Sequence, residues 1–532
     1  GSTGGADDNR FPRTVTAVDA LVAARRFTEA TQLAWSTLAL PAVPGECAGR
    51  MHLVLASVLL MSGYPEQAVT EATVTLTDRE LPNALWDAAQ VTRLQALTIL
   101  EDTSRVQEAA EEVLAGGERP GGDTALAAAV LALAWVAWDQ GQIAVALGHV
   151  RAAVVRADRG HADGIHPRLS LATMLTALGE FDDAATALDR AAEEDVLAAD
   201  LTCWLAPSLF MARLDMATGR LDAARAQVDE TLALGNGLGL RLLVPLALAT
   251  MAQIAVLRGD LREVGAYVDR CRHECRQPRT RLGAAAAAWS QAHLASRADG
   301  RAAAPEELDE LSAWVLTRPM LLVEEPAGAA VLIRAAVAAG RDDLVTPIVA
   351  AAERLALGNG GFPVIAASAT HARGLTDRDA RLLRQAADAY RHPWAVASAW
   401  EDAGTVALSA ADVDRDGARD AFERALTAYQ RAGAERDAAR VRSRLRGLGF
   451  RNRTWTRVDR PEAGWPSLTD TERRVACIVA EGLTNVQVAE RMFLSRHTVD
   501  FHLRQIFRKL GIRSRVELTR LVVEHARDPD GS

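Results

Sequence analysis

The residues best suited to chemistry in this 532-residue chain are the cations near its C-terminus, in the stretch RHTVDFHLRQIFRKL (residues 496–510). At about 100° per residue, a helix places His497, Arg504 and Arg508 on one face and apolar side chains on the other. Guanidinium groups can bind phosphate oxygens and the O6 and N7 atoms of guanine. The pattern therefore indicates a helix that meets a polyanion with one face and a protein core with the other.

An acid, Asp500, lies among these bases, and three interpretations of it stay open. The first is a solvated carboxylate favoured by the positive end of the helix dipole. In the second, Asp500 braces Arg504 at i, i+4 and so orients the guanidinium for a guanine. In the third, Asp500 accepts a hydrogen bond directly from the amino group of a cytosine.

Capping signals divide residues 467–527 into four helices. Ser or Thr three residues before Glu or Gln satisfies the free amides of a helix start, and Gly suits a helix end. The signals are TDTE (469–472), Gly482, TNVQ (484–487), Ser495 and SRVE (514–517). They predict a short helix, a tight turn and a longer third helix, which is the helix-turn-helix arrangement.

The segment LTDTERRV…EGLTNVQVAERMFLSRHTVDFHLRQIFRKLGI resembles the LuxR-type DNA-binding domain. The resemblance implies that the third helix enters the major groove of promoter DNA and that the fourth helix pairs two copies. It places Asp500, Phe501 and Arg504 at bases or phosphates, and Thr484 and Thr498 near the DNA backbone. With the outward face of the third helix added, the predicted DNA-binding residues are Thr484, Asn485, Arg496, His497, Thr498, Asp500, Phe501, Arg504, Arg508 and Lys509.

The long body before this segment repeats one phrase: a small residue, an apolar residue two positions on, and usually Ala three further on. Clear copies begin at Gly141, Gly179, Gly219 and Gly259, and weaker copies begin at Arg25, Gly63, Ser104 and Gly340. Neighbouring copies from Arg25 to Gly259 are 37–41 residues apart, which indicates stacked supersecondary units. Gly suits a left-handed helix end, and the small Ala lets two helices approach closely.

The phrase resembles the tetratricopeptide repeat, although its period is longer than 34 residues. A helix pair cannot bury its apolar face alone, so we expect neighbouring pairs to stack into a superhelix. The expected fold class is all-α, a TPR-like superhelix followed by a four-helix LuxR-type domain. The expected divisions are a flexible segment with a cloning remnant (1–16), the helical repeats (17–446), an Arg- and Pro-containing linker (447–466), the DNA-binding domain (467–527) and a tail (528–532).

Charge is distributed unevenly along the chain. Residues 440–532 contain 19 basic and 11 acidic residues, a net charge of +8, and the preceding part carries −17. A basic end on an acidic body confines nucleic-acid contact to the C-terminus, and it suggests that the body shields the basic helix until released. The longest apolar run is too short for a membrane span, and the five scattered cysteines fit reduced thiols in a cytoplasm.

Two further patterns are weaker. The stretch CRHEC (271–275) could hold zinc, but no second ligand cluster follows, so packing of buried thiols is the favoured interpretation. Trp135 and Trp138 share a helical face, which favours core packing over an aromatic ligand cage. The only lysine, Lys509, stands outside any Walker-type loop, so we expect no nucleotide site here. No nucleophile, metal or phosphate-binding arrangement stands out in the sequence, so we expect no cofactor, no metal and no enzyme activity.

Helical repeats followed by this DNA-binding domain resemble the C-terminal part of the large ATP-binding LuxR-type regulators. We therefore expect a cytoplasmic, sequence-specific transcriptional regulator, an activator, acting on double-stranded promoter DNA as a homodimer or higher oligomer. RNA polymerase is a further candidate partner, and the helical repeats would sense an effector of unknown identity or mediate assembly. The alternative is a helical-repeat interaction scaffold with a tail that binds nucleic acid loosely.

Overall fold

The computed structural model describes residues 10–78, 80–116, 123–159, 166–195, 206–276, 280–296, 305–409, 413–449, 464–468, 470–492, 496–512 and 514–527. Every regular element within these ranges is a helix, which confirms the all-α prediction. The chain divides into two compact units, Gly1–Gly449 and Phe450–Ser532. No helix in the described ranges has the length and apolar character needed to cross a membrane.

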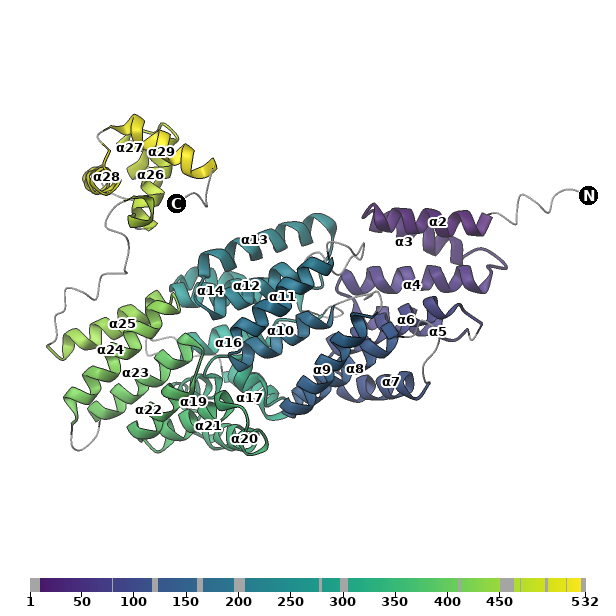
Figure 1. Cartoon of the computed structure of the whole chain (residues 1–532), viewed down its shortest axis with the longest axis horizontal. Coiled ribbons are helices and arrows are strands. Elements are labelled where there is room, and N and C mark those ends of the chain that lie inside the picture. Colours follow the sequence, from purple (N-terminus) through teal and green to yellow (C-terminus); the bar gives the residue numbers. More distant parts are fainter. Residues whose placement is uncertain are drawn as a thin grey trace, which may run out of the picture. The chain divides into compact units, whose positions relative to one another are not determined.

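The first unit is a series of helix pairs (Figure 1). Its helices are α2 (Arg10–Ala23), α3 (Phe27–Leu38), α4 (Gly45–Met61), α5 (Pro65–Leu76), α6 (Asn83–Ile99), α7 (Thr103–Ala115), α8 (Asp123–Asp139), α9 (Ile143–Ala157), α10 (Pro167–Leu178), α11 (Phe181–Asp195), α12 (Ala206–Ala217), α13 (Leu221–Leu238), α14 (Val244–Arg258), α15 (Leu261–Glu274), α16 (Ala284–Ala295), α17 (Pro305–Thr317), α18 (Leu321–Glu324), α19 (Gly328–Ala338), η1 (Asp342–Leu344), α20 (Val345–Gly358), α21 (Pro363–Thr376), α22 (Ala380–Ala389), α23 (Pro393–Ser409), α24 (Arg415–Arg431) and α25 (Glu435–Gly447). Successive first helices such as α4, α6 and α8 contact one another, and each second helix packs on the first helix of the next pair.

The repeated phrase marks the turn inside each pair. Its glycines have positive φ, for example 77° at Gly179 and 88° at Gly219, so each first helix ends in the left-handed region. The alanine five positions later lies in the second helix and is 0% exposed at both Ala184 and Ala224. The small side chain lets the second helix approach its neighbours closely, as the sequence analysis expected.

Two boundaries differ from the sequence-based expectation. α2 begins at Arg10, inside the segment expected to be flexible, because Phe11 and Val15 pack against a small apolar cluster that contains Val18. The copy of the phrase assigned to Ser104 lies inside α7, and the left-handed residue of that turn is Glu101, with φ 58°. The apolar pattern recurs one helical turn later there, which shifted the predicted turn.

The array coils so that turns of early repeats touch late repeats. Asn359 Nδ2 donates to the Gly141 carbonyl at 2.7 Å, across 218 positions. Arg391 Nη1 contacts Glu180 Oε2 at 2.6 Å, across 211 positions. Gly219 lies so close to Arg431 that a Cβ would overlap the carbonyl oxygen of Arg431. These contacts close the superhelix upon itself and enclose an interior.

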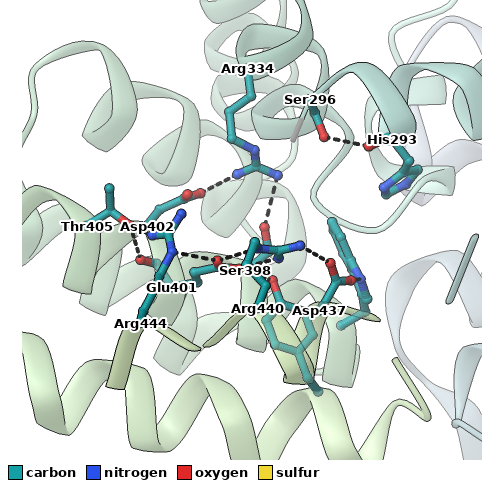
Figure 2. A network of polar contacts seen from close by, with 12 residues as sticks. His293, Ser296, Arg334, Ser398, Glu401, Asp402, Thr405, Asp437, Arg440 and Arg444 are labelled. Carbon is teal, nitrogen blue, oxygen red and sulfur yellow. Dashed lines mark hydrogen bonds and ion pairs between the residues drawn. The ribbon is translucent and has the colours of Figure 1, made fainter. Parts of the chain in front are cut away.

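A buried polar network fastens the last repeats together (Figure 2). Glu401 of α23 accepts hydrogen bonds from Arg440 Nε and Nη2 at 2.8 and 2.7 Å and from the Tyr429 hydroxyl at 2.8 Å. Arg440 also donates to Asp437 at 2.6 Å, and Asp437 accepts from the Trp394 indole at 2.8 Å. Figure 2 shows Arg440 between Glu401 and Asp437. Since each buried carboxylate has several donors, the network joins α23, α24 and α25 without leaving an unpaired charge among them.

The second unit contains η3 (Trp465–Ser467), α26 (Asp470–Ala480), α27 (Asn485–Met492), α28 (Arg496–Leu510) and α29 (Arg515–Arg527). α26 contacts the other three α-helices, and α27 packs on α28. The core is an apolar cluster that includes Val475, Val479, Val488, Val499, Ile506 and Leu518. This is the predicted four-helix arrangement, with the eight-residue α27 before the 15-residue α28.

Candidate nucleic-acid interface

The start of α27 is held by the capping box predicted at residues 484–487. The Gln487 amide donates to Thr484 Oγ1 at 3.4 Å, and the Thr484 amide donates to Gln487 Oε1 at 2.8 Å. A second box at α29 joins Ser514 and Glu517, with the Glu517 amide donating to Ser514 Oγ at 3.2 Å. These caps confirm the two predicted helix starts. Thr469 and Ser495, which were expected to cap α26 and α28, lie outside the described residues.

The inward face of α28 is the apolar stripe that the spacing predicted. Val499 and Ile506 are 0% exposed and Leu503 is 8% exposed. They pack in one cluster with Val488 and Ala489 of α27. Ala489 is small where the two helices cross, so α27 and α28 approach closely and the orientation of α28 is set by its buried side.

The opposite face of α28 carries exposed guanidinium groups. Arg504 and Arg508 are both exposed, one helical turn apart. Arg508 Nη2 donates to Gln505 Oε1 at 2.6 Å, which steadies the side chain along the helix. Two cations at this spacing on a 15-residue helix form a surface that can bind phosphates or guanine edges.

Lys509 lies differently from Arg504 and Arg508. Its ammonium lies 2.5 Å from Glu472 Oε2, and the exposed fractions of the two side chains are 21% and 6%. Glu472 belongs to α26, so this ion pair fastens α28 to α26. Lys509 therefore has a structural contact that the sequence pattern did not indicate, because its partner lies 37 positions earlier.

Asn485 and Thr484 also have contacts within the unit. Asn485 Oδ1 accepts from Arg515 Nη1 at 2.9 Å, and Arg515 also donates to the Leu483 carbonyl. Thr484 is exposed, with its hydroxyl in the cap of α27. Both positions stand at the N-terminal end of α27, where helix dipoles favour anions.

The remaining predicted residues lie in the first two turns of α28. They are Arg496, His497, Thr498, Asp500 and Phe501, and their side chains lie outside the described residues. The three interpretations of Asp500 therefore stay open.

The two weaker patterns have different outcomes. Cys271 is 0% exposed and its thiol donates to the Pro245 carbonyl at 3.3 Å, so this thiol packs in the core as expected. A hydrogen bond between the thiols, together with burial, raises the pKa of Cys271, and the same bond lowers the pKa of Cys275. Trp138 is 0% exposed and donates to Glu324 at 2.7 Å, but the neighbouring Trp135 lines a cavity.

That cavity was not foreseen from the sequence. It lies inside the first unit and brings Glu101, Asp139 and Arg318 to one place. These residues stand in three different repeats, and no local motif connects them. A sequence signal for the site existed only in Trp135, as the less favoured aromatic interpretation.

The second unit is similar to known bacterial regulatory proteins. Residues 466–522 match the family model described as bacterial regulatory proteins, luxR family. An HTH-type transcriptional regulator of Mycobacterium bovis is 52% identical over 59 residues, which are 11% of this chain and 7% of that protein. A nitrate/nitrite response regulator homologue of Haemophilus influenzae is 46% identical over 61 residues, 12% of this chain and 29% of that protein. The DNA-binding transcriptional activator DevR/DosR of Mycobacterium tuberculosis is 44% identical over 50 residues, 9% of this chain and 23% of that protein.

The C-terminal unit therefore contains a LuxR-type helix-turn-helix domain, which confirms the resemblance seen in the sequence. The chain spans only 7–29% of the length of these relatives. Among solved structures, a Rap protein complexed with the competence and sporulation factor covers 72% of this chain and 100% of its own, at 13% identity and a TM-score of 0.36. The maize pentatricopeptide repeat protein PPR10 covers 97% of this chain and 81% of its own, at 13% identity and a TM-score of 0.24.

Proposed function

We propose that this chain is a sequence-specific DNA-binding transcriptional regulator and that α28 reads the major groove. The observation that carries the proposal is the division of α28 into a buried apolar stripe and an exposed face bearing Arg504 and Arg508. The match of residues 466–522 to the luxR family supports the same assignment. A 15-residue helix oriented by its inward face can lie in the major groove and present its outward cations to DNA.

We assign different roles to the cations of α28. Arg504, nearer the centre of the helix, would bind a guanine, whereas Arg508 would bind a phosphate. Thr484 and Asn485, at the start of α27, would lie against the DNA backbone together with Arg496, His497 and Thr498. Phe501 would contact a base, and Asp500 would act in one of the three ways described above. Lys509 would contribute mainly through its ion pair with Glu472.

We also propose that two copies bind one operator and activate transcription. Val516 at the start of α29 is 79% exposed, an apolar side chain that pairing of two α29 helices would cover. Two reader helices would then meet half-sites about 34 Å apart, one turn of DNA. Activation is supported by the similarity of the C-terminal unit to the transcriptional activator DevR/DosR, and RNA polymerase would be the partner contacted in that case.

In this proposal the helical-repeat unit senses an effector or mediates assembly. The competing function is an interaction scaffold whose C-terminal unit binds nucleic acid without sequence preference. The two differ in a measurable way, because binding through phosphates alone depends steeply on salt and is nearly equal for all sequences.

The test is selection of binding sites by the full chain from a random duplex pool, followed by fluorescence anisotropy across a salt series. We expect one enriched motif, and a loss of about 1–3 kcal/mol in binding to that motif for Arg504→Ala. Arg381→Ala, an 85% exposed arginine of the first unit, is the matched control and should change neither affinity nor preference. Failure to enrich any motif would overturn sequence-specific reading and favour the scaffold.

Asp500→Ala separates the three interpretations of that residue in the same assay. Relaxed preference at one base pair with an unchanged salt slope indicates readout, either by Asp500 or through Arg504. The double variant with Arg504→Ala then divides these two cases, because a bracing role vanishes when Arg504 is absent. Tighter binding to every sequence would identify Asp500 as a solvated acid that repels phosphates.

A further inference from the structure

The interior of the helical-repeat unit holds a cavity of about 180 Å³. Its walls come mainly from α6, α8, α10 and α12, which belong to four successive pairs. Glu101 after α6, Ala157 at the end of α9, and Leu243, Leu282 and Arg318 complete the lining. The cavity is therefore a product of the coiling of the array. No single repeat contains enough of its wall to form it.

Most of the wall is apolar. Trp135 and Phe210 supply aromatic rings, and Leu94, Ile99 and Leu131 supply aliphatic surface. The Trp135 indole donates to Ser170 Oγ at 3.1 Å, so the polar edge of the ring is satisfied and its face remains for packing. An apolar cavity of about 150 Å³ can hold benzene, so this one fits a single ring with a short side chain.

Charged groups stand at one part of the wall. Arg318 Nη1 lies 2.6 Å from Glu101 Oε1, and Arg318 Nε lies 3.2 Å from Asp139 Oδ1. All three residues line the cavity, and the side chain of Asp139 is 16% exposed. A third carboxylate, Glu324 of α18, acts on both Asp139 and Arg318. Two carboxylates in the lining thus share one guanidinium, with a third nearby.

The pKa values of Asp139 and Arg318 agree with an excess of negative charge at this part of the wall. Burial raises the pKa of Asp139 to about 7, Arg318 opposes the rise, and Glu324 and Glu101 add to it. Burial alone would lower the pKa of Arg318, but the carboxylates of Glu101, Asp139 and Glu324 raise it above its ordinary value. Glu324 is also near the half-buried Arg213, so the local excess of negative charge is centred on Asp139 and Glu101. One additional cation at this place would balance the charge.

We propose that this cavity binds a small apolar molecule bearing one protonated amine, with its hydrocarbon part against Trp135 and Phe210 and its ammonium group beside Asp139 and Glu101. The wall recognises the hydrocarbon through burial of apolar surface. The carboxylates recognise the amine through charge-assisted hydrogen bonds, which are stronger than neutral ones. The same carboxylates repel an anionic ligand of equal size, so the site selects by charge.

That the bound amine is the effector of a DNA-binding regulator rests on the proposed function. Binding itself does not, because it can be measured without DNA. If the chain did not bind DNA with sequence specificity, the affinities for the amine and the other probes would be unchanged. If it did not bind the amine, the selection of DNA sites would be unchanged.

The experiment is isothermal titration calorimetry of the full chain with three probes that share a phenylethyl group: 2-phenylethylamine, 2-phenylethanol and 3-phenylpropanoate. At pH 8 the amine is protonated, since aliphatic amines have a pKa of about 10. We expect the amine to bind about tenfold tighter than the alcohol, because of the charge-assisted contacts. The carboxylate should bind more weakly than the alcohol.

Variants locate the site and identify its selective group. Asp139→Asn should remove most of the preference for amine over alcohol while alcohol binding remains. Asp123→Asn, at the start of the same helix and outside the cavity lining, is the matched control and should keep the full preference. If Asp139→Asn fails to fold, Glu101→Gln tests the same point, because the Glu101 side chain is 37% exposed and tolerates the change more easily.

Proton release gives a second readout. A bound ammonium group lowers the pKa of Asp139, so amine binding near pH 7 should release a fraction of a proton. The release is measured as the dependence of the binding enthalpy on the ionisation enthalpy of the buffer. Arg318, Glu101 and Glu324 are the charged groups that act on Asp139 in the wild type. The release should vanish in Asp139→Asn.

Three outcomes would overturn the proposal. Equal affinity for amine and alcohol at pH 8 would make the cavity a site without charge selection. Tightest binding of 3-phenylpropanoate would mean that Arg318 recognises the ligand instead. Absence of saturable binding by all three probes at millimolar concentration would show that the cavity is not a site for ring-sized ligands.

Discussion

The two units of this chain differ in how many charged side chains they bury. In the second unit the core is apolar, Glu472 is the buried charge among its described residues, and Arg504 and Arg508 of α28 face outward. In the first unit, charged groups such as Glu401, Asp437 and Asp215 are at most 6% exposed. The difference agrees with the roles proposed for the two units. DNA is larger than the domain and has to be contacted from outside, whereas a superhelix encloses its own contacts and any small ligand.

Placing charge inside or outside also has different energetic consequences. An exposed guanidinium contributes little to folding and is free to bind a phosphate. A buried carboxylate must have donors on every side, or it destabilises the fold by several kcal/mol. Substitutions that remove a buried charge should therefore act on stability, and those that remove an exposed cation of α28 should act on DNA binding. The predictions below test that contrast, beginning with the largest expected effect.

Glu401→Ala should be the most damaging single change. It leaves the half-buried Arg440 beside Asp437 without its main partner and removes an acceptor of Tyr429, so we expect a loss of about 3–5 kcal/mol in the free energy of unfolding. Glu423→Ala, in an i, i+4 pair with Arg419 on the neighbouring α24, is the control and should cost about 0.5 kcal/mol. Urea unfolding measures both. Equal losses would contradict a network in which burial sets the energy.

Gly219→Ala should destabilise the coil of the superhelix. The residue has φ 88°, and an added Cβ would overlap the carbonyl oxygen of Arg431 in the next coil. Gly340→Ala stands at the same place in the phrase, with φ 70° and no atom within 4 Å of the added Cβ. Gly340→Ala measures the cost of placing a residue with a Cβ in the left-handed region, about 1 kcal/mol in the free energy of unfolding. We expect Gly219→Ala to cost about 2 kcal/mol more, because of the overlap.

For these two glycines, thermal and urea unfolding of the full chain provide the measurement. A difference near zero between the two variants would mean that the coils separate freely, and the enclosed interior would then not be a fixed feature of the unit.

Asp139→Asn should change how stability depends on pH. The carboxyl has its ordinary pKa of 3.8 when unfolded and a pKa of about 7 when folded, where Arg318, Glu101 and Glu324 surround it. Between these values the unfolded chain has released the proton and the folded chain retains it, so rising pH destabilises the wild type; below 3.8 and above 7 the contribution is constant. From pH 5 to pH 8 the wild type should lose about 2–3 kcal/mol relative to the variant.

Urea unfolding at pH 5, 6, 7 and 8 measures this difference, with Asp123→Asn as the variant that should run parallel to the wild type. If Asp139→Asn also ran parallel, the carboxylate would be ionised in the folded state throughout this range. The charge imbalance argued for the cavity would then be absent.

The contrast between the units also explains what could be predicted from the sequence. The features of the C-terminal domain lie close together in the sequence: its helix caps, apolar stripe and cations occur within about sixty residues. Helix geometry alone places Val499 inward and Arg504 outward. The repeats were predictable because Gly and Ala recur at a fixed period. Both rest on periodicities that one chain segment carries by itself.

The rest depends on contacts between distant residues, and the periodicity does not specify them. The pairing of Lys509 with Glu472 needs the packing of α28 on α26, and the cavity needs Glu101, Asp139 and Arg318 to meet through coiling. The pitch of a superhelix follows from small rotations at each interface, which add up over many pairs. A phrase of six residues does not determine such rotations.

The smallest expected effect sharpens the contrast within a single helix, because Arg508 and Lys509 are adjacent in α28 but differ in exposure. Lys509→Met removes the partner of a buried carboxylate, so it should lower the free energy of unfolding of the second unit by about 1–2 kcal/mol. It should leave the slope of DNA affinity against salt concentration unchanged, whereas Arg508→Ala should reduce that slope by about one unit with little change in stability. Thermal unfolding and anisotropy across a salt series give both values for each variant. A reduced slope for Lys509→Met would mean that the wild-type Lys509 ammonium binds a phosphate in the complex. The ion pair with Glu472 would then have to open when DNA binds. In that case the division between inward and outward charge would hold only for the free protein.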